Sequence, residues 1–138
     1  MCRFITTAHL TEDAARIRTS VFIEEQGFVN EFDEQDDVSY HIVAYDGDVP
    51  VAVCRFTPGE DGVCTVGRVA VVPDHRGKSL GAALLAEAER QATGMGQSLM
   101  VLGAQVRARG FYEKQGYTAF GDGYMEEWCP HIMMRKEL

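Results

Sequence analysis

A junction between an apolar strand and a helix, near the middle of the chain, has residues suited to binding a diphosphate. The mostly apolar residues 66–72 are followed, after three residues, by Arg76-Gly77-Lys78-Ser79 and then by a helical pattern. A turn of small residues at the start of a helix directs several backbone N–H groups, and the positive end of the helix dipole, toward one point. Arg76 and Lys78 add positive charge, and glycine lets a ligand approach the backbone closely. The sequence therefore predicts a pyrophosphate site at residues 76–82.

Two common nucleotide-binding motifs do not fit this junction. Gly77-Lys78-Ser79 matches the end of a P-loop, but that motif requires glycine where this chain has Val72. The dinucleotide-binding fingerprint requires three glycines, and only Gly77 and Gly81 are available here. Both motifs therefore fail on spacing.

A second segment places a tyrosine in a helical context. It reads Gln105-x-x-Ala108-x-x-Phe111-Tyr112, followed by Gly116-Tyr117. Together with Arg76-x-x-Ser79-x-Gly81-Ala82, it resembles the two signatures of the GNAT superfamily of N-acetyltransferases. The chain differs at Ser79, where the family usually has glycine, and at Gln105, where asparagine is commoner. Residues 21–26, 32–36 and 130–133 further resemble the ElaA/YjcF-like branch of the superfamily.

The resemblance implies that the chain binds acetyl-coenzyme A (acetyl-CoA) as co-substrate. No metal is expected, because His9, His41 and His75 show no ligand spacing. The backbone of residues 69–71 would pair with the pantetheine arm, and an N–H of this strand would hold the thioester carbonyl. The residues expected to contact acetyl-CoA are Val69, Ala70, Val71, Arg76, Gly77, Lys78, Ser79, Leu80, Gly81, Ala82, Gln105, Ala108 and Tyr112.

The same resemblance gives Tyr112 the role of general acid, which protonates the departing thiolate. A phenol can do this because the thiolate of coenzyme A is a base of comparable strength. The alternative for Tyr112 is a packing role, like that of Phe111 beside it. Some relatives place a catalytic glutamate where this chain has Thr65, which cannot act as a base.

The general base is therefore left open by the sequence. An ammonium must lose a proton before it can attack, and the candidates for removing it are Glu24, Glu25, His131 or a relay of water molecules. The alternative for His131 is a hydrogen-bonded structural histidine, and the alternative for Glu25 is an exposed position on a surface helix.

An acidic segment lies between residues 24 and 37. It has seven carboxylates and no lysine or arginine: Glu24, Glu25, Glu31, Asp33, Glu34, Asp36 and Asp37. Such a run is usually a solvated loop. The alternative is a wall of negative charge that attracts a protonated amine.

Length and composition limit the classes of protein and of partner that remain possible. The 138 residues, 46% of them hydrophobic, fit one domain over 1–138 with its own core. There is no apolar run of about 18 residues and no signal peptide, so we expect a cytoplasmic protein without a membrane partner. The net charge of −8 argues against nucleic acid as a partner. The four cysteines lack zinc-site spacing and are expected to be free thiols.

The elements that must position these residues follow from periodicity and turn signals. Strands are expected at 3–7, 39–46, 49–56, 63–72, 98–102, 117–121 and 124–135. Helices are expected after the N-cap Thr11, over residues 80–92 and over 107–115. The order predicts an α/β protein with a mixed sheet covered by helices. The resemblance implies a mostly antiparallel sheet of six or seven strands and about four helices.

These inferences lead to one functional hypothesis and two alternatives. The leading hypothesis is an acetyl-CoA-dependent N-acetyltransferase that acetylates a primary amine of a small molecule by direct attack. Polyamines, amino sugars and aminoglycosides are the substrate classes considered. The alternatives are acetylation of a lysine or N-terminus in a protein or peptide, and a non-catalytic sensor that binds acetyl-CoA. A homodimer is expected by analogy with the family alone.

Overall fold

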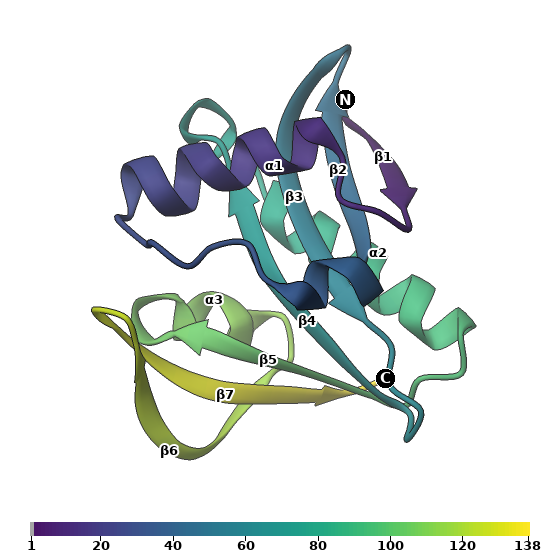
Figure 1. Cartoon of the computed structure of the whole chain (residues 1–138). Coiled ribbons are helices and arrows are strands. Elements are labelled where there is room, and N and C mark those ends of the chain that lie inside the picture. Colours follow the sequence, from purple (N-terminus) through teal and green to yellow (C-terminus); the bar gives the residue numbers. More distant parts are fainter. Residues whose placement is uncertain (1) are drawn as a thin grey trace.

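The computed structural model describes residues 2–138 and forms one seven-stranded sheet (Figure 1). The strand order is β1-β2-β3-β4-β5-β7-β6. Neighbouring strands are antiparallel except β4 and β5, which are parallel. The bounds are β1 (Cys2–Thr7), β2 (Tyr40–Asp46), β3 (Val49–Thr57), β4 (Val63–Val71), β5 (Leu99–Gln105), β6 (Thr118–Glu126) and β7 (Cys129–Glu137). The predicted mixed, mostly antiparallel sheet is confirmed.

Helices cover both faces of the sheet. The α-helices are α1 (Glu12–Arg18), α2 (Leu80–Gly94) and α3 (Arg109–Lys114), and α1 continues into the π-helical η1 (Thr19–Glu25). Short 3-10 helices are η2 (Glu34–Val38), η3 (Pro73–His75) and η4 (Val106–Ala108). Figure 1 shows α1 in front of the sheet and α2 behind it.

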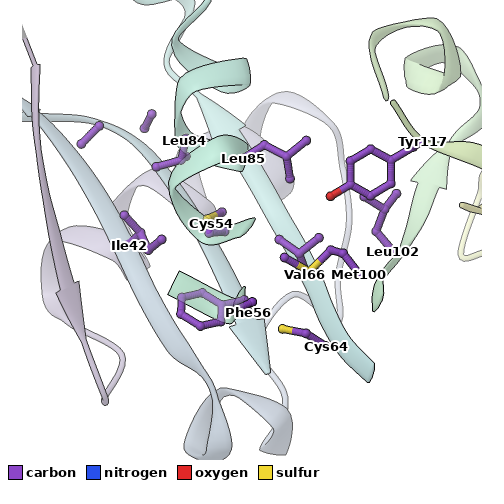
Figure 2. Close-up of a cluster of buried hydrophobic side chains, with 14 of the residues drawn as sticks. Ile42, Cys54, Phe56, Cys64, Val66, Leu84, Leu85, Met100, Leu102 and Tyr117 are labelled. Carbon is purple, nitrogen blue, oxygen red and sulfur yellow. The ribbon is translucent and has the colours of Figure 1, made fainter. Parts of the chain in front are cut away.

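Side chains alternate between the two faces of the sheet along the central strands, so each face has its own hydrophobic core. Val43 and Val53 pack with α1 and η1, whose buried residues are Ala14, Ile17, Val21 and Phe22. Ile42 and Cys54 point the other way, toward Leu84 and Leu85 of α2 (Figure 2). The predicted N-cap Thr11 is confirmed, because its hydroxyl accepts from the Ala14 N–H at 3.2 Å.

The last two strands differ from the prediction. The sequence Gly121-Asp122-Gly123 looks like a turn, but it lies inside β6, where the register with β7 shifts between Phe120 and Tyr124. The turn itself is at Glu127, a non-glycine residue with φ +52°. Two glycines allow a bulge as well as a turn, and only pairing with β7 distinguishes the two. Tyr124 and Glu126 therefore belong to β6, not to the final strand.

A β-bulge in β4 precedes an opening in the sheet. Val53 pairs with Ala70 and Arg55 with Gly67, so β4 has one residue more than β3 between these pairs. Arg68 lies in this bulge with φ +54°. On the other side, β4 pairs with β5 only from Val63–Leu99 to Thr65–Val101, after which the two strands diverge (Figure 1).

Two further predictions concern the whole chain. Cys2, Cys54, Cys64 and Cys129 are all free thiols, as expected, and the last three are buried. Within residues 2–138, no helix is both long enough and apolar enough to cross a bilayer.

Candidate active site

Two clefts lie where β4 and β5 diverge. The turn cleft, about 590 Å³, is lined by the turn before α2, residues 69–71 of β4 and the second half of α3. The hairpin cleft, about 730 Å³, is lined by the β6–β7 hairpin, the end of β5 and residues 25–31. The clefts share part of their walls, namely Gln26, Val69, Arg76, Ala108 and Tyr112. Two ligands, one in each cleft, would therefore meet at Tyr112.

The turn cleft is shaped for a diphosphate. Gly77 and Ser79 have φ of +78° and +61°, so the backbone curls before α2 begins. Within the described chain, the N–H groups of residues 77–82 donate to no backbone carbonyl. A Cβ added at Gly81 would lie 3.4 Å from the Phe111 ring, so a larger residue would crowd the cleft. Open N–H groups at the start of a fifteen-residue helix suit an anion of this size.

Most residues predicted to contact acetyl-CoA line the turn cleft, with two exceptions. The residues that line it are Val69, Ala70, Val71, Arg76, Gly77, Ser79, Leu80, Gly81, Ala82, Ala108 and Tyr112. Lys78 is exposed and outside the lining of both clefts. Gln105 lines the hairpin cleft, where its Nε2 donates to Gln26 Oε1 at 2.8 Å.

Arg76 does not point freely into the turn cleft. Its guanidinium makes a bidentate ion pair with Glu25, at 2.6 and 2.7 Å, and its Nε donates to the Val71 carbonyl at 2.8 Å. The hydrogen bonds from Arg76 lower the pKa of Glu25. Because both Glu25 oxygens are already occupied by a cation, this carboxylate is a poor proton acceptor. Glu24, the other acidic candidate, is exposed and lines neither cleft.

Three arginines and three carboxylates form a cluster beside the hairpin cleft, which we call the ion cluster; four of its members are buried, Arg68 is 20% exposed and Asp33 is 40% exposed. Its members are Arg18, Arg55, Arg68, Glu31, Asp33 and Asp36. Burial opposes ionisation of Asp36, but hydrogen bonds from Arg18 and Arg55 outweigh it and hold the pKa of Asp36 well below its usual value. Within the acidic segment, Glu31 and Asp36 are buried, and Glu24, Glu25, Asp33, Glu34 and Asp37 are exposed. Four of the seven carboxylates, Glu25, Glu31, Asp33 and Asp36, thus bind arginines, and the segment is only in part a solvated loop.

Tyr112 stands at the junction of the two clefts. Its ring packs edge-on against Phe111 and Tyr117, with centroid distances of 5.0 and 6.0 Å. Burial raises the pKa of Tyr112, so the phenol keeps its proton at neutral pH. Within residues 2–138 its hydroxyl has no hydrogen-bond partner, which leaves the proton available to a ligand.

His131 of β7 lines the hairpin cleft and is 6% exposed. Its Nδ1 lies 2.9 Å from the Cys129 carbonyl oxygen, which can only accept, so Nδ1 carries a proton. In the neutral ring the lone pair is then on Nε2, which lies 3.5 Å from Glu126 Oε2. The structure thus orients one basic nitrogen toward a carboxylate.

Aromatic side chains surround this pair. Tyr124 lies opposite His131 in the β6–β7 ladder, with ring centroids 5.6 Å apart. A Cβ at Gly103 would overlap the Tyr124 hydroxyl, so a larger residue at this position of β5 would displace the Tyr124 side chain. Phe28 packs on Trp128 at 5.4 Å and also contacts His131.

Residues 25–31 are connected to both sides of the hairpin cleft. Glu25 and Glu31 bind arginines that follow or belong to β4, and Gln26 binds Gln105 of β5. At the hairpin tip, the Glu127 carboxylate accepts from the N–H groups of Val29 and Asn30, at 2.8 and 2.9 Å. The segment therefore forms a bridge over the gap between β4 and the hairpin.

Sequence reasoning missed Tyr124, Glu126 and the ion cluster. Tyr124 and Glu126 alternate on one strand and share the face of His131, but this signal depends on the correct end of β6. The arginines of the ion cluster come from α1, β3 and β4, and no local spacing connects them.

Comparison with known proteins identifies the family of this chain. The sequence profile described as "Acetyltransferase (GNAT) domain" matches residues 6–138. The uncharacterized N-acetyltransferase YjcF of Bacillus subtilis is 34% identical over 129 residues, which cover 91% of each chain. Protein ElaA of Escherichia coli is 30% identical over 129 residues, covering 89% of this chain and 84% of ElaA.

Solved structures of related proteins have the same fold as this chain. The crystal structure of Escherichia coli ElaA has a TM-score of 0.86 at 26% identity and covers 99% of this chain and all 100% of its own. An acyl-CoA N-acyltransferase from Pseudomonas aeruginosa has a TM-score of 0.85 at 28% identity, with 99% of each chain covered.

Proposed function

Because this chain belongs to the GNAT acetyltransferase family, in its ElaA/YjcF-like branch, and is an acyl-CoA-dependent acyltransferase, we propose that it acetylates a primary amine of a small molecule. The observation that carries this proposal is the meeting of the two clefts at Tyr112. Acetyl-CoA would lie along residues 69–71 with its diphosphate on residues 77–82. The amine would enter from the hairpin cleft.

The reaction proposed is direct attack. The ammonium first gives one proton to a base, and its nitrogen then bonds to the thioester carbon. A backbone N–H in the β4 bulge, at Val69, supports the oxyanion that forms. The carbon–sulfur bond breaks, the nitrogen loses its second proton, and the Tyr112 hydroxyl supplies a proton to the thiolate. Tyr112 is reprotonated from solvent, so the products are an amide, free coenzyme A and one proton.

His131 is the base that the geometry supports best among the three side chains considered. Its Nδ1 proton is held by the Cys129 carbonyl, which leaves Nε2 free to accept. Glu25 is engaged by Arg76, and Glu24 faces neither cleft. A water molecule between the amine and Nε2 would serve the same purpose.

A small acceptor is favoured by the bridge formed by residues 25–31. This segment contacts Arg76 on one side and the hairpin tip on the other. A volume of about 730 Å³ is that of a small-molecule site.

The first test is calorimetric titration of the purified protein with acetyl-CoA, with NAD and ATP as controls. Selective, saturable binding of acetyl-CoA is expected. Release of free thiol is then measured with a panel of small amines and with a lysine peptide. Binding of NAD or ATP instead would overturn the cofactor assignment. Turnover with the peptide alone would move the acceptor to proteins, and binding without any turnover would indicate a sensor.

A further inference from the structure

Four glutamates in the described part of the chain line the hairpin cleft, and their carboxylates have different binding partners. Glu25 is paired with Arg76, Glu31 with Arg18 and Arg68, and Glu127 accepts two backbone N–H groups. Glu126 has no arginine, lysine or N–H partner within residues 2–138, and its side chain is 53% exposed. One carboxylate in this cleft is thus available to a ligand.

Glu126 and His131 converge in an arrangement that a single proton donor can bridge. In neutral His131, Nε2 is an acceptor, and it lies 3.5 Å from the Glu126 oxygen, which is also an acceptor. This separation is too long for a good hydrogen bond even if the ring is protonated. A primary ammonium placed beside both atoms can donate one N–H to each of them.

The surroundings indicate what the ammonium is attached to. Tyr124 and Trp128 flank Glu126 in the chain and line the same cleft, with 38% and 48% of their surfaces exposed. Exposed ring surface attracts both a cation and apolar or planar carbon. The face of Trp128 also carries the Arg107 guanidinium, at 5.4 Å, so Tyr124 offers the ring face that is clear of arginine.

From these contacts we infer that Glu126 and His131 Nε2 form the recognition site for the acceptor's ammonium group, and that the acceptor is an arylalkylamine-type small molecule. The inference rests on the proposed function and specifies its substrate class. Glu126 holds the charge, Tyr124 contacts the apolar group, and His131 takes the proton that the ammonium releases. Glu126 is then a specificity-determining residue, not the base.

The test compares a charged acceptor with an uncharged one. The substrates are 2-phenylethylamine and its β,β-difluoro analogue, which is much less basic and largely uncharged above neutral pH. The variants are Glu126→Gln and the control Glu137→Gln, an exposed glutamate at the far end of β7. Calorimetry with acetyl-CoA establishes that each variant is folded and binds the co-substrate.

We expect Glu126→Gln to raise KM for 2-phenylethylamine at least about tenfold, the size of one charge-assisted hydrogen bond. Its kcat should change much less, and KM for the difluoro analogue should stay as in the wild type. Glu137→Gln should leave both substrates unaffected. Equal effects on the two amines, or no effect, would overturn the assignment of Glu126 while the wild-type activity upholds the proposed function. If the wild type binds acetyl-CoA and acetylates neither these nor other small amines, the proposed function fails and the inference fails with it.

Discussion

Arg68 and Glu31 are joined at the β4 bulge, where Arg68 Nε lies 3.0 Å from Glu31 Oε2 and also donates to the Glu31 carbonyl oxygen at 3.1 Å. Arg68 has φ +54°, a conformation that costs a non-glycine residue about 1 kcal/mol or more. The ion pair therefore anchors a strained residue. Because Val69 follows directly, the same contact holds the backbone that lines both clefts.

Two substitutions of Arg68 distinguish the energetic cost of its backbone strain from the contribution of its ion pairs. Arg68→Ala removes the guanidinium and keeps the strain, so the free energy of unfolding should fall by about 3 kcal/mol. Arg68→Gly also loses the ion pairs but adopts positive φ readily, and should be about 1 kcal/mol more stable than the alanine variant. Urea denaturation measures both. If the two variants were equally stable, strain at Arg68 would not be a significant factor.

Tyr112→Phe should lower kcat by about 100-fold or more, because the thiolate would leave without a proton donor. The dissociation constant of acetyl-CoA should be unchanged, since the ring still packs on Phe111 and Tyr117. Tyr40→Phe, on β2 and outside both clefts, is the matched control. Unchanged turnover in Tyr112→Phe would remove Tyr112 from the mechanism.

Gly81→Glu should abolish binding of acetyl-CoA, measured by calorimetry. The new side chain would begin 3.4 Å from the Phe111 ring and 3.8 Å from Val71, and it would bring negative charge to a diphosphate site. Gly94→Glu places the same residue at the other end of α2, where a Cβ meets nothing within 4 Å. This control should bind like the wild type. Wild-type affinity in Gly81→Glu would refute the placement of the diphosphate.

Ser79→Gly should raise the free energy of unfolding by about 1 kcal/mol and keep acetyl-CoA binding. Ser79 has φ +61°, which glycine adopts without the steric cost that serine bears. The left-handed backbone also gives a physical reason for the glycine usual in the family. Thermal or urea denaturation of the two proteins, compared at one pH, checks the prediction, and a loss of stability would contradict it.

Asp36→Asn should destabilise the protein by about 3–5 kcal/mol at neutral pH, because Arg18 and Arg55 would lose a buried partner. The wild-type pKa of Asp36 is lowered on folding, so its contribution is present above the unfolded pKa of about 4 and declines as pH falls below that value. The difference between wild type and variant should thus be smaller at about pH 3. Urea denaturation at the two pH values tests this. A difference that grew on acidification would mean the pKa is not lowered.

Much of the fold could be predicted because the signals are local. The turn between the strands expected at 39–46 and 49–56, the N-cap at Thr11 and the pattern of α2 each lie within a few consecutive residues, and all are found in the structure. The β6–β7 turn could not be predicted in the same way. The strands expected at 117–121 and 124–135 put the turn at residues 122–123, whereas Glu127 carries the positive φ of the actual one.

The sequence by itself determined the order of the elements, the turn at residues 76–82 and the helix that carries Tyr112, because motif spacing and periodicity describe neighbouring residues. Only the tertiary structure decided which charge meets which. Glu25 and Arg76 are 51 residues apart, and Glu31 and Arg68 are 37 apart. Glu126 meets His131 through the register of a hairpin. Such contacts depend on which faces pack together and on how strands are aligned, and no local pattern contains that information.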